Sequence, residues 1–132
     1  MKLDHMVVWS RDTDETAEFW ADILGGRLGG VAGYNIRLDF DNGVTVQFAD
    51  ISRLSDAAEI QQRHYAIVVS DADFRTALKL IETRRIRYWA DAHRHEEGRS
   101  YHYDGGRVFF LLDPNGHLLE LNRGRVGGMG RR

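Results

Sequence analysis

The pattern of hydrophobic and polar residues repeats once along this chain and predicts the same order of elements in each half. At the N-terminus the two kinds of residue alternate with period two, as they do in a half-buried strand. An apolar stripe with helical spacing follows, between an N-cap at Asp12 and the glycine pair Gly25-Gly26. The turn Asp41-Asn42-Gly43 then predicts a hairpin. The elements expected in the first half are a strand over 3–9, a helix between the two caps, and strands near 34–40 and 44–49.

The second half repeats this order from residue 64 onward. Ser70, with Asp73 three residues later, is typical of a helix N-cap, and an apolar stripe at helical spacing follows it. The closing hairpin surrounds Asp113-Pro114-Asn115-Gly116, where Pro and Gly occupy favoured positions of a type I turn. The elements expected after the helix are a strand over 86–89, a polar stretch from about 90 to 106, and strands over 108–112 and 117–122.

These elements predict an α+β fold made of two tandem βαβββ modules. We expect the first module at 1–50, a linker at 51–62, the second module at 63–123 and a flexible tail at 124–132. The length of 132 residues fits one domain that can bury a core without covalent staples.

The composition argues against cysteine-based sites, nucleic-acid binding and membrane spans. The chain has no cysteine, which rules out disulfides, a thiol nucleophile, iron–sulfur ligation and Cys-type zinc sites. A net charge of −2 gives no electrostatic case for nucleic acid. No apolar run approaches the roughly 20 residues of a membrane span, and the N-terminus lacks the apolar core of a signal peptide. The expectation is therefore a cytoplasmic protein with a small-molecule partner.

The two halves place residues of metal-ligand type at matching positions. His5 and His64 stand near the start of the first strand of each half. Gln47 and Glu120 each follow the glycine of a hairpin turn by four residues. On the last strand, alternation puts Glu120 on the face opposite the aliphatic residues, which should pack on the helix. The duplication thus predicts one shared metal site formed by His5, His64 and Glu120.

Several motifs resemble those of the vicinal-oxygen-chelate superfamily. They are the opening Leu3-Asp4-His5, the helix end Ile23-Leu24-Gly25, the start of the second module at 64–69 and the closing segment 109–120. The resemblance covers residues 3 to about 122. That superfamily includes glyoxalase I, extradiol dioxygenases, fosfomycin-resistance thiol transferases and bleomycin-resistance binding proteins. It implies that the two modules form an open, cup-shaped mixed sheet around a divalent metal held by His5, His64 and Glu120.

Two departures from the family pattern bear on the reaction. Gln47 stands where glyoxalase I places a fourth ligand, commonly a glutamate, and a neutral amide is a weak ligand. We therefore expect Gln47 to line the site. Ala90-Asp91-Ala92 stands where fosfomycin-type enzymes carry a phosphonate-binding lysine. Extradiol dioxygenases share the triad, but most are about twice this length, so dioxygenase, lyase or isomerase, and thiol-transfer chemistries all stay open.

The predicted site suits a metal-dependent enzyme that acts on a small molecule with adjacent oxygens. Two imidazoles and a carboxylate leave open positions on Fe(II), Mn(II), Ni(II) or Zn(II) for substrate oxygens. An alternative is a non-catalytic protein that binds a small molecule or antibiotic without metal, and a third possibility is a structural protein with a vestigial site. Binding proteins of this family generally lack the full triad, which favours the enzyme. Relatives of this size often dimerise, so a homodimer is expected.

The polar stretch over 91–107 allows two interpretations. It is either a solvated hairpin or a lid that supplies a proton donor and an anion-binding arginine. In the second case His102 and Tyr103 are the expected catalytic groups, and Arg107 lines the substrate, because these residues lead directly into the metal-bearing hairpin.

Other aromatic residues and histidines have structural alternatives. Trp9, Phe48 and Trp89 are candidates for apolar walls of the site, although core packing is the commoner role for any one of them. A single strand histidine is more often structural than a ligand, and a single strand glutamate is usually solvated. His117 is expected at the surface or in a turn.

Overall fold

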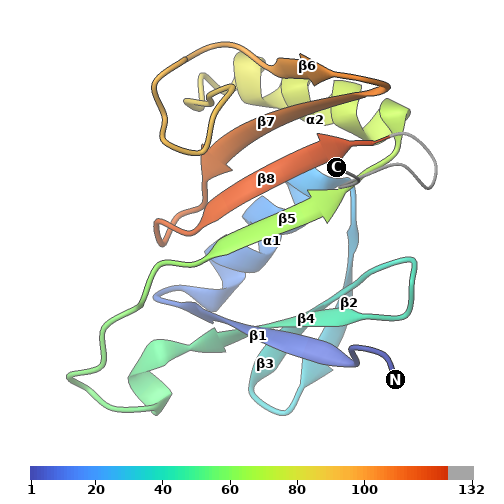
Figure 1. The fold of residues 1–132 in the computed structure, drawn as a ribbon. Helices are drawn as coiled ribbons and strands as arrows, with labels where there is room; N and C mark the ends of the chain where they lie inside the picture. The colour runs from blue at the N-terminus through green and yellow to red at the C-terminus, as the bar shows by residue number, and fades with distance from the viewer. Residues whose placement is uncertain (125–132) are drawn as a thin grey trace. The chain divides into compact units, whose positions relative to one another are not determined.

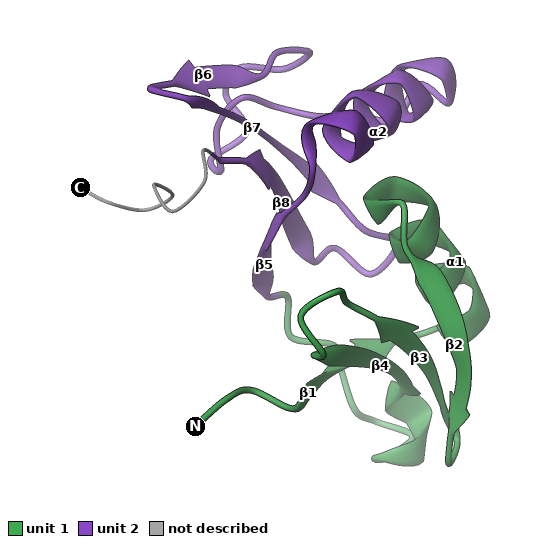
Figure 2. Ribbon diagram, turned by 90° about the vertical axis from the view of Figure 1, so that its right-hand side faces the viewer, with its two compact units in different colours: residues 1–62 green, residues 63–132 purple. Residues whose placement is uncertain are grey.

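The computed structural model describes residues 1–124, so the expected tail lies, except for Gly124, outside the described residues. The chain divides into two compact units between residues 62 and 63 (Figure 2). This boundary is where the sequence places the end of the linker. Within the described part of the chain, no helix is long and apolar enough to cross a membrane.

The first unit is a four-stranded mixed sheet with one helix. Its strand order is β1-β4-β3-β2, in which β1 runs parallel to β4 and the other neighbours are antiparallel. The elements are β1 (His5–Ser10), α1 (Thr13–Leu24), β2 (Arg27–Ala32), β3 (Asn35–Asp39) and β4 (Thr45–Asp50), followed by a short 3-10 helix over Ile51–Arg53.

The second unit has the same topology. Its strand order is β5-β8-β7-β6, with β5 parallel to β8, and α2 crosses one face of the sheet (Figure 1). The elements are β5 (His64–Val68), α2 (Asp71–Thr83), β6 (Tyr101–Tyr103), β7 (Gly106–Leu112) and β8 (Leu118–Arg123). The α+β class and the two tandem modules are therefore confirmed.

The strand registers show that the duplication extends to single positions. In the first unit, Gln47 on β4 pairs with the residue two positions after His5 on β1. In the second unit, Glu120 on β8 pairs with the residue two positions after His64 on β5. His5 and His64 are thus equivalent, and so are Gln47 and Glu120.

The helices begin where the sequence predicts and cover the aliphatic face of each sheet. The Asp12 carboxylate accepts the backbone N–H of Glu15 at 3.0 Å, and the Ser70 hydroxyl accepts that of Asp73 at 3.1 Å. On α1, Trp20 packs edge-on against Phe48 of β4, with ring centroids 5.3 Å apart. Phe48 is fully buried there, so it belongs to the core rather than to a wall of the site.

The second helix packs in the same manner. Phe74 of α2 meets Phe109 of β7 edge-on at 5.0 Å, and Leu119 and Leu121 of β8 are fully buried. Because side chains alternate along a strand, Glu120 lies between these leucines in sequence but on the opposite face of the sheet. The aliphatic face therefore packs on the helix and the polar face is left for a site, as the alternation predicts.

One predicted strand is absent from the described residues, and two observed strands are not predicted by the sequence. Residues 86–89 are not a strand, because Trp89 makes only isolated bridges, to Glu97 and Phe110. The sequence pattern does not predict the strand Arg27–Ala32, since Gly29 and Gly30 interrupt it and it pairs with β3 around a bulge. A short strand, Tyr101–Tyr103, also lies within the predicted polar stretch.

The turn before β8 explains why His117 is not at the surface. The Asp113 carboxylate accepts the backbone N–H groups of Asn115 and His117 at 2.8 and 2.9 Å. This folds the turn so that His117 is only 1% exposed, and its Nδ1 accepts the backbone N–H of Arg63 at 3.1 Å. His117 therefore ties the entry of β5 to the turn.

Candidate metal centre

Two of the three predicted ligands meet on the polar face of the second sheet. The Nε2 atom of His64 lies 3.0 Å from Oε1 of Glu120. The His64 ring also stands edge-on to Phe110, with centroids 6.0 Å apart, and its side chain is 47% exposed against 19% for Glu120. An imidazole nitrogen and a carboxylate oxygen that already converge are a donor pair for a divalent metal, which would take the place of the shared proton.

The second carboxylate oxygen of Glu120 also accepts a hydrogen bond. Asn122, on the same face of β8, donates its Nδ2–H to Oε2 of Glu120 at 3.0 Å. The Oδ1 atom of Asn122 in turn accepts a hydrogen bond from the hydroxyl of Tyr103 on β6. Asn122 is only 3% exposed, so this bond lies in a low-dielectric environment. His64, Glu120, Asn122 and Tyr103 thus form one connected network across three strands.

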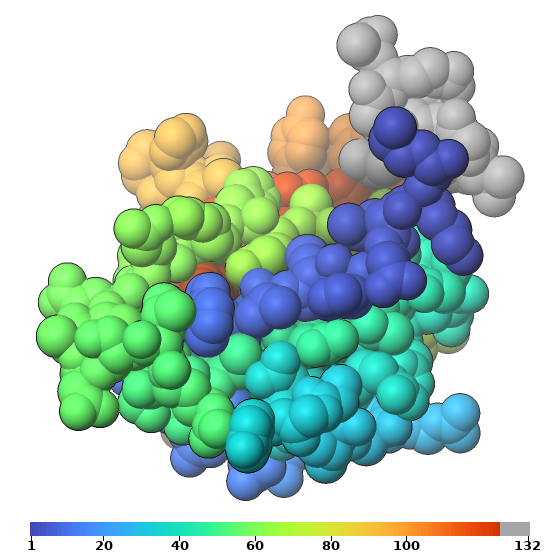
Figure 3. All heavy atoms as spheres, turned by 90° about the horizontal axis from the view of Figure 1, so that it is seen from below, coloured from blue at the N-terminus to red at the C-terminus, as the bar shows by residue number. Residues whose placement is uncertain are grey.

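The first unit presents the third predicted ligand. His5 is 47% exposed, and its Nδ1 lies 2.8 Å from a carboxylate oxygen of Asp4. In a neutral imidazole this contact keeps the proton on Nδ1 and leaves the Nε2 lone pair to bind a metal. β1 lies at the surface of its unit, where residues 1–10 are coloured dark blue (Figure 3).

Gln47 does not stand alone on its face of the first sheet. Its Oε1 accepts a hydrogen bond from Nδ2 of Asn35 at 3.2 Å. Val7 and Trp9 share the face of His5 by alternation, and both are exposed. This face thus carries a neutral amide pair and an exposed apolar strip, with the Arg37–Asp39 ion pair beside Gln47 on the neighbouring strand.

Within residues 1–124, no group of three or more His, Asp or Glu side chains is arranged so that it could hold a metal ion. The structure brings His64 and Glu120 together and shows His5 at the equivalent place in the other unit. The His64–Glu120 pair fits a divalent metal by its chemistry, because an imidazole nitrogen and a carboxylate oxygen are ligand types that such metals take.

The structure separates the two expected catalytic groups. Tyr103 joins the Glu120 network, whereas His102 pairs across from Arg107 on the other face of the sheet. Arg107 stacks its guanidinium over Phe74 of α2 at 5.3 Å and donates to the Ser100 hydroxyl at 2.7 Å. The expected orientation of His102 and Arg107 is therefore corrected, since both lie on the helix side, away from Glu120.

Trp89 remains a candidate for lining the substrate. It pairs directly with Phe110, so the two side chains lie on the face that carries His64 and Glu120. Trp89 is only 5% exposed, and the guanidinium carbon of Arg87 lies 5.1 Å from the centroid of its ring.

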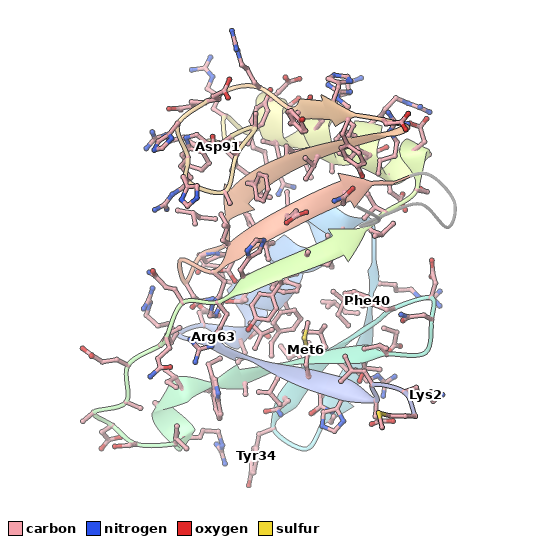
Figure 4. All side chains as sticks on the ribbon, in the orientation of Figure 1. Lys2, Met6, Tyr34, Phe40, Arg63 and Asp91 are labelled. Carbon is pink, nitrogen blue, oxygen red and sulfur yellow. The ribbon has the colours of Figure 1, made fainter. Side chains whose placement is uncertain are left out.

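The beginning of the 91–107 stretch is a turn built around Asp91. The Asp91 carboxylate accepts the backbone N–H groups of Glu96 and His95 at 2.9 Å, and it is labelled within this loop in Figure 4. These bonds, with that from Glu96 the strongest, hold the pKa of Asp91 below its ordinary value. Residues 93–99 of this turn are exposed, as the solvated-hairpin interpretation expects, whereas Tyr103 at the end of the stretch is connected to Glu120 through Asn122.

Sequence reasoning missed Asn122 and Gly106. Asn122 could have been found by alternation, because it lies two residues after Glu120 and shares its face. Gly106 could not, since its role depends on the ring of Tyr103 lying directly over its α-carbon.

Comparison with known proteins identifies the class. Residues 2–121 match the family described as the Glyoxalase/Bleomycin resistance protein/Dioxygenase superfamily, and the chain belongs to it. The resemblance to the vicinal-oxygen-chelate superfamily is therefore confirmed.

Individual relatives include both transferases and oxidases. The chain is 27% identical over 127 residues to "Glutathione transferase FosA" of Serratia marcescens, covering 94% of this chain and 82% of that protein. Among solved structures it is similar to "Oxidase ChaP-H2", at 35% identity and TM-score 0.86, covering 96% of both chains. It is also similar to "Oxidase ChaP-H1", at 31% identity and TM-score 0.84, covering 97% of this chain and 99% of that one.

Proposed function

We propose that this protein is a divalent-metal-dependent enzyme that acts on a small molecule with two adjacent oxygens. The proposed ligands are His5, His64 and Glu120, and Fe(II), Mn(II), Ni(II) and Zn(II) all suit this set. The observation that carries the proposal is the convergence of His64 and Glu120, together with the equivalent register of His5. When bound, such a metal supplies Lewis acidity toward both substrate oxygens.

The chain's own residues hold and orient the substrate in this proposal. Phe110 lies beside the ligand pair as buried apolar support, and the exposed Val7 and Trp9 offer apolar surface on the first unit. The amides of Gln47 and Asn35 can donate to or accept from a substrate oxygen without adding charge. An aromatic substrate with neighbouring hydroxyl or carbonyl oxygens fits both features.

Among the reactions of the superfamily we propose oxidation first. Two solved structures that are 35% and 31% identical to this chain, and that match nearly its whole length, are described as oxidases. Thiol transfer is the runner-up, because the curated relative is a glutathione transferase. Against it, Asp91 occupies the region where fosfomycin-type enzymes carry a lysine, and its carboxylate is engaged in the turn.

A non-catalytic binding protein is the alternative from a different class. The exposed apolar strip of Val7 and Trp9 suits such a ligand as well, whereas a binding protein without metal would have no use for the paired His64 and Glu120. We further propose a homodimer, in which two-fold symmetry gives two equivalent sites. The cytoplasmic location expected from the sequence stays a prediction.

The test of the reaction is anaerobic reconstitution with Fe(II) or Mn(II), followed by a substrate panel. Catechols with dioxygen, methylglyoxal with glutathione, and fosfomycin with glutathione span the three chemistries. We expect metal-dependent oxygen uptake with an aromatic diol, because the apolar face and the ligand set suit that substrate. The Glu120→Ala protein is the control and should show none. Binding of the aromatic compound to metal-free protein, without turnover under any condition, would support the binding protein instead.

A further inference from the structure

The amide of Asn122 links Glu120 to the hydroxyl of Tyr103 through two hydrogen bonds. A carboxylate can only accept hydrogen bonds, so the Nδ2–H of Asn122 must face Oε2 of Glu120. This leaves Oδ1 of Asn122 for the hydroxyl of Tyr103, which must then donate its proton. The direction of every bond from Tyr103 to Glu120 is thereby fixed.

The proton of the Tyr103 hydroxyl is therefore engaged in the hydrogen bond to Asn122. A general acid must present its proton to the substrate, whereas this hydroxyl donates to an amide that is nearly fully buried. The hydroxyl is thus placed to orient a neighbour, which differs from the proton-donor role expected for Tyr103.

Gly106, on the neighbouring strand, leaves room for the ring of Tyr103. Tyr103 and Gly106 are directly paired where β6 meets β7. A β-carbon built on Gly106 would overlap the ring and the hydroxyl of Tyr103. Gly106 has no left-handed backbone angle that would call for glycine, so the close approach of the ring accounts for the residue.

We infer that Tyr103 is a positioning residue, which acts through Asn122 to hold the Glu120 carboxylate with Oε1 toward His64. This inference rests on the proposed metal site. Outer partners of this kind restrict the rotation of a ligating carboxylate, so the ligand loses less freedom when it binds the metal. Tyr103 therefore sets metal affinity without touching the metal or the substrate.

The experiment measures Mn(II) affinity by calorimetry and the visible spectrum of bound Co(II). Loss of an outer partner typically lowers metal affinity roughly 10–100-fold. We expect Asn122→Ala to lower the affinity for Mn(II) by an amount within that range. Tyr103→Phe and Gly106→Ala should lower it by about 3–10-fold, because these residues act one hydrogen bond further from Glu120. The Co(II) spectrum should change in all three variants.

Tyr101→Phe is the matched control. Tyr101 lies two residues away on the same strand face, stacks on Tyr103 at 6.4 Å and is 57% exposed. It loses the same hydroxyl outside the network, so its metal affinity and Co(II) spectrum should equal those of the wild type.

The double variant Tyr103→Phe/Asn122→Ala distinguishes positioning from general loosening. If Tyr103 acts only through Asn122, the double variant should bind Mn(II) no more weakly than Asn122→Ala alone. Additive losses, or wild-type affinity in Tyr103→Phe, would overturn the inference while leaving the metal site intact. If Asn122→Ala does not fold, the comparison of Mn(II) affinity between Tyr103→Phe and Tyr101→Phe still tests the inference, because only the first should bind more weakly than the wild type.

Failure of the proposed function itself gives a different result. In that case the wild type binds no Mn(II) or Co(II), and the role of Tyr103 in metal binding falls with it. The side-chain amide resonances of Asn122 in metal-free protein then report whether the hydrogen bonds exist, since they should shift in Tyr103→Phe and not in Tyr101→Phe.

Discussion

Replacement of Glu120 by alanine is expected to abolish binding of a divalent metal at micromolar concentration. The carboxylate is one of two donors that already converge, and a pair of neutral imidazoles is a poorer set for Fe(II), Mn(II), Ni(II) or Zn(II). The loss should exceed the roughly 10–100-fold that removal of an outer partner costs. His64→Ala should have the same effect, because it removes the other member of the pair.

Gln47→Ala is the matched control for this prediction. Gln47 holds the position in the first unit that Glu120 holds in the second, but it is a neutral amide bonded to Asn35. Metal content after purification and calorimetry with Mn(II) should show about one ion per chain for the wild type and for Gln47→Ala. Far-UV circular dichroism confirms that each variant is folded, since metal loss can lower stability. Full occupancy in Glu120→Ala would remove Glu120 from the site.

The largest effect on stability is expected for Phe109→Ala. Phe109 is fully buried and contacts the rings of Phe74 and Tyr88 at centroid distances of 5.0 and 5.7 Å. Truncation of a buried phenylalanine to alanine lowers the free energy of unfolding by about 3–5 kcal/mol. In a chain of this size that corresponds to a drop in Tm of roughly 10–20 °C.

Thermal unfolding followed by circular dichroism measures this drop. Val31→Ala serves as the control, because Val31 is 69% exposed and its truncation should change stability by less than about 0.5 kcal/mol. Phe109 faces α2, so the folded variant should bind Mn(II) as the wild type does. A loss of stability below about 1 kcal/mol would contradict the packing of α2 on this sheet.

The modules are predictable because their signals are local. The caps at Asp12 and Ser70 and the alternation around Glu120 each depend on residues within one or two turns of the chain. The strand over 27–32 escapes prediction because Gly29 and Gly30 give no alternation, and its pairing is made by backbone atoms. The segment 86–89 resembles a strand in its aromatic residues, yet only Trp89 pairs.

The sequence predicts one part of the candidate site, the pair formed by His64 and Glu120. Duplication and alternation both point to His64 and Glu120, and the structure brings them together. The sequence favours His102 and Tyr103 as a pair, although neighbours on a strand must point to opposite faces. The pairing of β6 with β7 decides whether His102 or Tyr103 points to the side of Glu120, and the alternation along one strand does not show this pairing. The buried His117 depends likewise on the backbone of Arg63, 54 residues away.

The central claim is that one metal joins His5 of the first module to His64 and Glu120 of the second. X-ray absorption spectroscopy of protein loaded anaerobically with one equivalent of Fe(II) tests it most directly, because the spectrum reports the number of imidazole ligands. We predict two imidazoles in the wild type and one in His5→Ala. One imidazole in the wild type, with an unchanged spectrum in His5→Ala, would confine the metal to the second module and contradict the claim.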